Sequence, residues 1–333
     1  MRIPPFLAKG DSLSLVAPSF GTATEPYFTR MNASLANFKK LGFNSIVGPN
    51  VFRDEGIAGS ASPEERGQEI NEAFASSSKA VFSVGGGETM VEILPFVDFK
   101  RIAELPPKFF MGYSDNTNLT FLLPTLCNTA SVYGPNAASF YALPLRCAEE
   151  DAIALMEGER EFLGYPKYSI SKNNPSAPLR RYSLTQKKII EPVHYEGPFQ
   201  GTLLGGCLDC LVTLCGTRFD KVKEFQKQHL EGIVWFLESC DLNAISIRRA
   251  LFQLKEAGWF DSAQGFLIGR PLHPEECFGT TARESYLSLL EELGKPILYN
   301  VDLGHIPPSL PLLCGAEAQI SMVGDNFRVR YIY

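Results

Sequence analysis

The sequence predicts an α/β fold: a Rossmann-like, doubly wound parallel sheet as the N-terminal domain, and a smaller mixed α/β domain after it. Two observations support this prediction. Short apolar runs of strand length alternate with segments whose apolar residues recur at helical spacing, which is typical of βαβ units. Near the C-terminus, the alternating runs 316–322 and 327–332 flank Gly324 and predict a hairpin, which adds antiparallel strands to the second half.

In the N-terminal half, strands are predicted at residues 13–17, 44–47, 79–84, 109–111 and 131–133. Helices are predicted at 27–41, from 63, at 89–94 and after Ser114. Ser62 and Glu65 form a capping box with Pro63 at the first helical position, which fixes the start of the second helix. Sites in parallel sheets lie beyond the carboxyl ends of the strands. Both the glycines at 85–87 and Ser114 are predicted at such ends.

Between about residues 164 and 198, Pro, Ser, Lys, Arg and Tyr accumulate with little periodicity. We therefore predict an N-terminal domain over 1–164, a linker or cleft-bordering segment over 165–198, and a C-terminal domain over 199–333. In the last, the predicted strands are 201–205, 233–237, 265–268 and 296–301, and the predicted helices are 206–215, 245–257 and 281–293.

Composition narrows the class of protein. The chain has 333 residues, of which 45% are hydrophobic and 20% charged, as in ordinary globular proteins. A net charge of -6 without a basic run argues against nucleic-acid binding. No apolar stretch reaches the roughly 18 residues of a membrane span, and the first residues lack a signal-peptide core. The eight cysteines are scattered in apolar surroundings, which favours reduced thiols, so we expect a cytoplasmic protein.

Ser114 follows the predicted strand 109–111 and precedes a predicted helix, so it lies on a sharp strand-to-helix turn. This is the setting of a nucleophile elbow, in which the backbone N–H of the next residue, Asp115, points at a developing oxyanion. The match is incomplete, because Asn116 stands where the G-x-S-x-G pattern has glycine. The alternative is that Ser114 only caps the helix.

A serine nucleophile needs a base and a group that orients the base. Of the four histidines, His305 follows a buried strand in a loop rich in Gly and Pro, where a fixed imidazole would be useful; the alternative is a histidine satisfied by backbone. His229 follows charged helix residues and is expected to be solvated. Glu238 directly follows the apolar run 233–237, so it needs either solvent or a specific partner, for which an imidazole N–H would be suitable. The chain order Ser, Glu, His is a known order for a triad.

Two further motifs each have two possible interpretations. The glycines at 85–87 lack the P-loop lysine and the dinucleotide spacing, so nucleotide binding is rejected. They could bring backbone N–H groups to a substrate carbonyl, or simply form a tight turn. Cys207 and Cys210, with His273 and Cys277 as a second pair, suggest a zinc or redox site, although Cys207 and Cys210 open an apolar helix where structural thiols are common.

Taken together and in order, these segments resemble the LD-carboxypeptidase family of serine peptidases, which includes microcin C immunity-type peptidases. The resemblance covers nearly the whole chain. The residues that carry it are Gly10-Asp11, Ala17-Pro18-Ser19, Gly86-Gly87, Lys108, Gly112-Tyr113-Ser114-Asp115, Leu204-Gly205-Gly206, Trp235-Phe236-Leu237-Glu238 and Gly304-His305. The chain departs from the family pattern at Gly85, where arginine is frequent, at Cys207, where asparagine is usual, and at Ser239, where aspartate is common.

The resemblance implies Ser114 as the nucleophile, His305 as the base and Glu238 as the residue that orients it. It further implies an oxyanion hole near Gly87 and Asp115, to which Gly86 also contributes, a cleft between two domains, a homodimer, and no metal or cofactor.

The resemblance leaves two substrates open: a murein tetrapeptide that loses a D-amino acid across an L,D bond, or a peptidyl- or aminoacyl-nucleotide. The Gly-Gly segment and the run ending at Glu238 look nearer to the microcin immunity branch. Tyr165, Tyr168, Arg180, Arg181 and Tyr182 either border the cleft or belong to a solvated linker. Two hypotheses of other classes remain: a non-catalytic small-molecule binding protein, and a zinc-dependent hydrolase.

Overall fold

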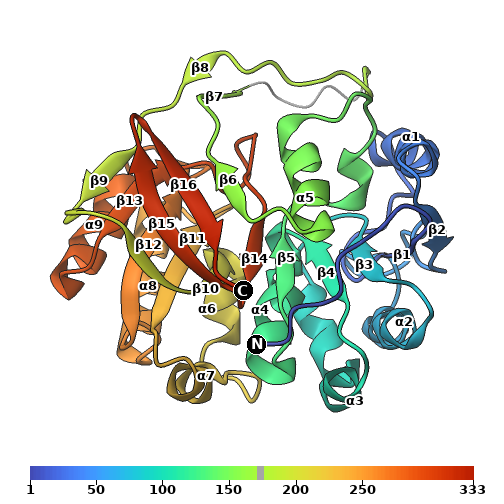
Figure 1. The fold of residues 1–333 in the computed structure, drawn as a ribbon, viewed down its shortest axis with the longest axis horizontal. Coiled ribbons are helices and arrows are strands. Elements are labelled where there is room, and N and C mark those ends of the chain that lie inside the picture. Colours follow the sequence, from blue (N-terminus) through green and yellow to red (C-terminus); the bar gives the residue numbers. More distant parts are fainter. Residues whose placement is uncertain (171–175) are drawn as a thin grey trace. The chain divides into compact units, whose positions relative to one another are not determined.

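The computed structural model describes residues 1–170 and 176–333. The chain divides into two compact units (Figure 1). The first comprises residues 1–159, the described part of 171–183, and 311–313. The second comprises residues 160–170, 184–310 and 314–333. The C-terminal part of the chain thus returns to the first unit for one short strand, which the sequence pattern does not predict.

The first unit contains a six-stranded sheet in the order β14-β5-β4-β3-β1-β2. Its strands are β1 (Ser12–Val16), β2 (Asn44–Val47), β3 (Ala80–Ser83), β4 (Phe109–Gly112), β5 (Ser131–Tyr133) and β14 (Leu312–Cys314). The pairs among β1 to β5 are all parallel. The predicted doubly wound parallel sheet is confirmed.

Helices cover both faces of this sheet, as Figure 1 shows with α1 and α5 on one side and α2 and α3 on the other. The helices are α1 (Tyr27–Lys40), α2 (Pro63–Ala75), α3 (Phe99–Glu104), α4 (Thr117–Cys127) and α5 (Cys147–Glu157), with 3-10 turns η1 (Met90–Phe96), η2 (Ser114–Asn116) and η3 (Ala137–Ser139). Because both faces are covered, β3 and β4 are buried along their full length. The capping box predicted at Ser62 and Glu65 is present.

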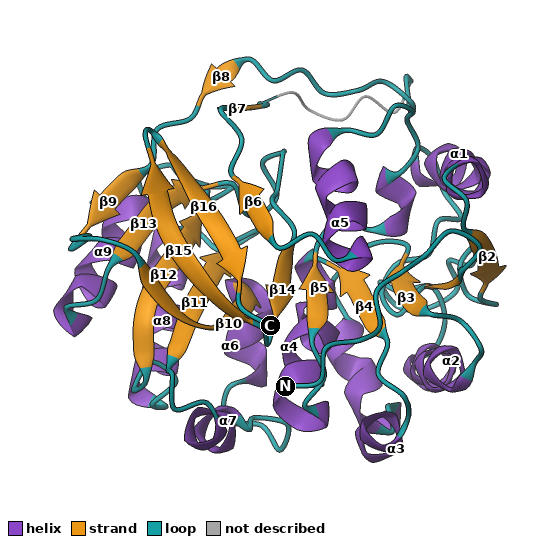
Figure 2. Ribbon diagram, in the orientation of Figure 1, coloured by secondary structure: helices purple, strands orange, loops and turns teal. Residues whose placement is uncertain are grey.

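The second unit contains an eight-stranded sheet in the order β6-β16-β15-β10-β11-β12-β13-β9. Its strands are β6 (Glu161–Leu163), β9 (Glu191–Val193), β10 (Phe199–Cys207), β11 (Ile233–Glu238), β12 (Ala263–Gly269), β13 (Ile297–Val301), β15 (Glu317–Val323) and β16 (Asn326–Tyr331). Strands β10 to β13 are parallel. The predicted hairpin is confirmed as the antiparallel pair β15–β16 (Figure 2).

The helices of the second unit are α6 (Leu208–Leu214), α7 (Val222–Gln228), α8 (Ala244–Glu256) and α9 (Ala282–Leu290), with the 3-10 turn η4 (Glu291–Leu293). One predicted boundary is wrong: the helix expected from residue 206 begins at Leu208, because β10 continues through Cys207. Gly205 has φ +154°, and a Cβ built there would lie 1.8 Å from the Phe236 carbonyl oxygen. Only glycine allows β10 and β11 to approach this closely.

Part of the segment 165–198 has regular structure. The strands β7 (Lys167–Tyr168) and β8 (Gln186–Lys187) pair with each other, while β9 joins the large sheet. Residues 171–175 of this predicted linker lie outside the described residues. In the first unit, Tyr182 stacks on Arg146 at 4.7 Å, and Tyr141 donates a hydrogen bond to the Arg180 carbonyl. Residues 180–182 are therefore attached to the first unit and are not merely solvated.

Within the described residues, no helix is both long and apolar enough to cross a lipid bilayer.

Candidate functional site

Ser114 lies at the carboxyl end of β4, where the chain turns into η2 and α4. Its φ is +63°, in the left-handed region that non-glycine residues rarely occupy. Such a conformation costs on the order of 1–3 kcal/mol and persists only where the surroundings enforce it. The half-buried Ser114 therefore stands on a strained turn, as expected of a nucleophile elbow.

The glycine loop after β3 lies directly against this turn. A Cβ built on Gly86 would lie 3.1 Å from Ser114 Cβ and 3.2 Å from Ser114 Oγ. A Cβ on Gly87, which has φ +155°, would lie 2.2 Å from Ser19 Oγ. Gly87 needs glycine because its φ is positive and Ser19 occupies the space of a side chain, whereas a side chain at Gly86 would press on Ser114. The structure thus brings Gly86 and Ser114 together at adjacent strand ends.

Asn116 explains why the G-x-S-x-G pattern can lack its last glycine here. The Asn116 side chain is fully buried, and its Nδ2 donates to the Gly85 carbonyl at 2.8 Å and to Asn136 Oδ1 at 3.2 Å. Asn136 Oδ1 also accepts from the Tyr113 N–H at 3.3 Å. The amide of Asn116 therefore joins the Ser114 turn to the glycine loop, which a glycine could not do.

The Asp115 side chain holds the same turn from its buried side. Its carboxylate accepts from the Met90 N–H at 2.9 Å, from Ser19 Oγ and from Asn118 Nδ2. Burial raises the pKa of the Asp115 carboxyl above its ordinary value, against these hydrogen bonds, which lower it. The side chain of Asp115 is thus structural, and its backbone N–H is the group predicted to face an oxyanion.

In the second unit, Glu238 is the last residue of β11 and His305 follows β13, so both lie at the carboxyl edge of the parallel strands. His305 Nδ1 and Glu238 Oε2 are 2.9 Å apart. The Glu238 side chain is fully buried and that of His305 is 15% exposed. Because an ionised carboxylate only accepts hydrogen bonds, a neutral His305 beside ionised Glu238 carries its proton on Nδ1, and Nε2 then has the lone pair of a base. The structure thus confirms that Glu238 has an imidazole partner.

Two glycines make room for Glu238. A Cβ on Gly304, whose φ is +101°, would lie 2.6 Å from Glu238 Oε2. A Cβ on Gly269 would lie 2.4 Å from the Leu303 carbonyl oxygen and 3.0 Å from Glu238 Cβ. The glycine before His305 is therefore required by the carboxylate that holds the imidazole.

Arg270 clamps the loop that carries His305. Its Nη1 donates to the Val301 carbonyl at 3.3 Å and to Asp302 Oδ1 at 2.9 Å, and its Nη2 donates to the carbonyls of Ile306 and Pro308 at 3.3 and 3.2 Å. Arg270 is 4% exposed. One buried guanidinium thus holds both ends of the loop, because its donors diverge in a fixed fork. No sequence motif identifies this residue; its only signal is an arginine directly after a buried strand.

Replacing Arg270 by alanine is expected to destabilise the protein by about 1–3 kcal/mol, because three carbonyls and one oxygen of Asp302 lose a buried partner, while Lys188 remains paired with Asp302. Urea unfolding monitored by circular dichroism measures this loss. Arg249→Ala is the matched control, since Arg249 is exposed on α8 and should change stability by less than about 0.5 kcal/mol. Equal midpoints for the two variants would show that the clamp is unimportant.

The other predicted ligands and bases do not form a second centre. The expectation that His229 is solvated is wrong: it is 8% exposed, stacks on Phe225 at 4.1 Å and lies 2.8 Å from Glu231. His194 and His273 are exposed. Within residues 1–170 and 176–333, no group of three or more His, Cys, Asp or Glu side chains is placed to hold a metal ion. The zinc hypothesis therefore has no site in this part of the chain.

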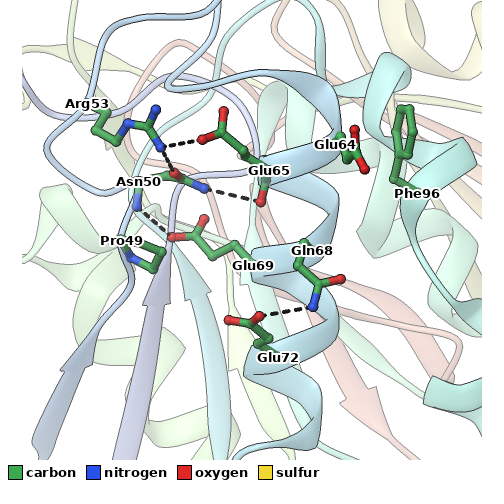
Figure 3. Close-up of a pocket in the computed structure, with 9 residues that line it drawn as sticks. All are labelled: Pro49, Asn50, Arg53, Glu64, Glu65, Gln68, Glu69, Glu72 and Phe96. Carbon is green, nitrogen blue, oxygen red and sulfur yellow. Dashed lines mark hydrogen bonds and ion pairs between the residues drawn. The ribbon is translucent and has the colours of Figure 1, made fainter.

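The first unit also contains a pocket of about 570 Å³ beside α2 (Figure 3). Acidic side chains of α2 line it together with Arg53 and Phe96. Glu69, at its buried side, is 3% exposed and accepts from two backbone N–H groups, those of Ala17 and Asn50, at 2.9 and 3.0 Å. This carboxylate joins the ends of β1 and β2.

Replacing Glu69 by glutamine is expected to lower the free energy of unfolding by about 1–3 kcal/mol. Each oxygen of Glu69 accepts from a different backbone N–H, and the glutamine NH₂ cannot accept, so one N–H loses its partner. Thermal and urea unfolding test this. Glu64→Gln on the exposed face of the same helix should leave both transitions unchanged, and the idea is wrong if the two variants behave alike.

Comparisons with known proteins place these features in a family. The model of the LD-carboxypeptidase N-terminal domain matches residues 13–134, and the model of the C-terminal domain matches residues 200–320. A probable murein peptide carboxypeptidase of Bacillus subtilis is 27% identical over 327 residues, which cover 96% of this chain and 91% of that protein. The microcin C7 self-immunity protein MccF of Escherichia coli is 26% identical over 346 residues, covering 98% and 95%.

Solved structures show the same fold. A wild-type MccF structure matches with a TM-score of 0.84 at 22% identity, covering 100% of this chain and 99% of the other. A muramoyltetrapeptide carboxypeptidase from Oxalobacter formigenes matches with a TM-score of 0.72 at 21% identity, covering 96% and 98%. With both family models matched over well over half of its length, the chain belongs to the LD-carboxypeptidase family of peptidases.

Proposed function

We propose that the protein is a serine carboxypeptidase that removes a terminal D-amino acid from murein tetrapeptides by hydrolysing an L,D-amide bond. The hydrogen bond between buried Glu238 and His305 is the observation that carries this proposal. A carboxylate that fixes the tautomer of an imidazole is the base half of a hydrolase triad. Ser114, strained and set against Gly86, supplies the nucleophile half.

In the proposed reaction, Ser114 Oγ attacks the amide carbonyl carbon while His305 Nε2 accepts the hydroxyl proton. Backbone N–H groups of Gly86, Gly87 and Asp115 stabilise the charge that develops on the carbonyl oxygen. His305 then gives its proton to the leaving amine, so that the D-amino acid departs and an acyl-enzyme remains. Water, activated by the same imidazole, hydrolyses the ester. No step uses a cofactor.

A second candidate is the cleavage of peptidyl- or aminoacyl-nucleotides. It is favoured by the likeness to MccF, whose solved structures include complexes with aspartyl sulfamoyl adenosine and glutamyl sulfamoyl guanosine. Both candidates share the same triad and differ in what lies beyond the scissile bond. The proposed partner is therefore a small peptide or peptidyl-nucleotide. We further propose that the protein is a cytoplasmic homodimer.

The test offers the wild-type protein three substrates: a murein tetrapeptide with a terminal D-alanine, its isomer with a terminal L-alanine, and an aminoacyl sulfamoyl adenosine. Mass spectrometry of the products identifies each cleavage. We expect release of D-alanine from the first peptide and no reaction of its isomer. Cleavage of the nucleoside analogue alone would instead support the second candidate function, the cleavage of peptidyl- or aminoacyl-nucleotides. If none reacts, the carboxypeptidase proposal fails and a non-catalytic binding protein becomes the better account.

The proposed homodimer is tested separately. Sedimentation equilibrium over a range of protein concentrations should give twice the chain mass of 36.8 kDa. A monomer at all concentrations would contradict this part of the proposal and leave the chemistry of the site untouched.

A further inference from the structure

Three cysteines gather around the Glu238 end of the second sheet. Cys207 is the last residue of β10 and pairs in register with Glu238 across the β10–β11 ladder. Cys210 follows three residues later in α6, and Cys240 lies two residues beyond Glu238. All eight cysteines, each in the described part of the chain, are thiols. The proposed triad makes no use of these three groups.

Cys207 and Cys210 are close enough to react with each other. Cys207 is the extended residue that caps α6 and Cys210 lies in its first turn, which is the Cys-x-x-Cys arrangement found in thiol–disulfide oxidoreductases. A hydrogen bond with the Cys210 side chain, together with burial, raises the pKa of the Cys207 thiol well above its ordinary value. Cys207 is 1% exposed, whereas Cys210 is half-buried. The two thiols therefore interact through a hydrogen bond, and Cys210 is the more exposed of the two.

Asp209 connects this pair to the turn after Glu238. Its Oδ2 accepts from Cys207 Sγ at 3.3 Å and from the Cys240 N–H at 3.0 Å, and its Oδ1 accepts from the Asp241 N–H at 2.8 Å. The same turn also contacts the imidazole, because the Cys240 thiol forms a hydrogen bond with His305. Burial raises the pKa of the Cys240 thiol, and this hydrogen bond lowers it. A change at Cys207 can thus pass through Asp209 to the backbone beside both Glu238 and His305.

We propose that Cys207 and Cys210 form a reversible disulfide that loosens the turn at Cys240 and Asp241. The oxidant is a low-molecular-weight disulfide such as oxidised glutathione. The Cys210 thiolate attacks one of its sulfurs, which forms a mixed disulfide and releases one thiol. Cys207 then loses its proton and displaces the second thiol. Two protein thiols are oxidised and one external disulfide is reduced to two thiols.

Oxidation changes the structure because it removes the thiol proton of Cys207. Oxidised Cys207 has no S–H, so it can no longer donate to Asp209. The carboxylate is then free to move, and the N–H groups of Cys240 and Asp241 lose a fixed acceptor. The expected fall in activity rests on the proposed function, because it assumes that Glu238 and His305 are catalytic. The disulfide and the loosened turn do not rest on it.

The experiment equilibrates the wild-type protein in glutathione buffers from reducing to oxidising and follows three readouts. Peptide mapping after alkylation locates the disulfide, hydrogen exchange monitors Cys240 and Asp241, and D-alanine release measures activity. Oxidation should join Cys207 to Cys210, speed exchange of the two amides by about tenfold or more, and lower kcat by a similar factor. Dithiothreitol should restore all three. Cys210→Ser should stay reduced at this site and keep its activity in oxidising buffer.

Cys215→Ser is the matched control, because Cys215 closes the same helix and is also half-buried, yet it should leave the response unchanged. Absence of the Cys207–Cys210 link at any glutathione ratio overturns the proposal. A link that alters neither exchange nor kcat overturns the coupling. A link with faster exchange in a protein that cleaves none of the three substrates, oxidised or reduced, leaves this inference standing and counts against the proposed function.

Discussion

Ser114→Ala is expected to lower kcat/KM on the substrate that the protein cleaves by at least about 10³-fold, because no acyl-enzyme can form without the hydroxyl. Residual catalysis would come from the backbone N–H groups and from substrate positioning. The measurement is product release under single-turnover and steady-state conditions. A fluorophosphonate probe should label the wild-type protein at Ser114 and leave the variant unlabelled.

Ser114→Gly keeps this prediction independent of folding. Glycine adopts φ +63° without the strain that serine bears there, so this variant should be equally inactive and about 1 kcal/mol more stable. Ser77→Ala, at an exposed serine of the same unit, should change neither rate nor stability. A Ser114 variant that cleaves at the wild-type rate would remove serine catalysis from the proposal.

Glu238→Gln has the second largest expected effect, a fall in kcat of about 10²–10⁴-fold. The glutamine amide can accept from or donate to His305, so it no longer enforces the tautomer with the proton on Nδ1. It also lacks the negative charge that stabilises the imidazolium formed during the reaction. The acid limb of the pH–rate profile should therefore move to lower pH, since the imidazole of the variant takes up its proton less readily.

The chain contains a matched control for this substitution. His229 and Glu231 form a second imidazole–carboxylate pair at 2.8 Å, but this pair precedes β11, whereas Glu238 and His305 follow the carboxyl ends of their strands. Glu231→Gln should leave kcat and the pH profile unchanged. If both glutamine variants lose activity equally, or if neither does, Glu238 has no special role.

Much of the fold could be predicted from local sequence. The Ser62 capping box, the β15–β16 hairpin and the alternation of strands and helices are confirmed, because each depends on residues close together in the chain. The prediction of a helix from residue 206 was wrong for a non-local reason: the ladder between β10 and β11 continues to the pair Cys207 and Glu238, so the chain stays extended past Gly205.

Within the site, the sequence also predicted that Glu238 would need a partner, since a carboxylate at the end of an apolar strand cannot stay buried alone. It could not predict Asn116 as the link between the Ser114 turn and the glycine loop, nor Arg270 as the clamp of the His305 loop. The expectation that His229 is solvated was wrong for the same reason: the charged residues next to it in the sequence do not indicate that its ring stacks on Phe225.

The sequence by itself determined the family, the order of strands and helices, and which residue types stand at the strand ends. Only the tertiary structure decided that Glu238 and His305, 67 residues apart, share a hydrogen bond, that Gly86 lies against Ser114, and that Cys207 stands beside Glu238. The physical reason is that local backbone preferences act over a few residues, whereas hydrogen bonds between buried groups depend on which strands become neighbours in a sheet.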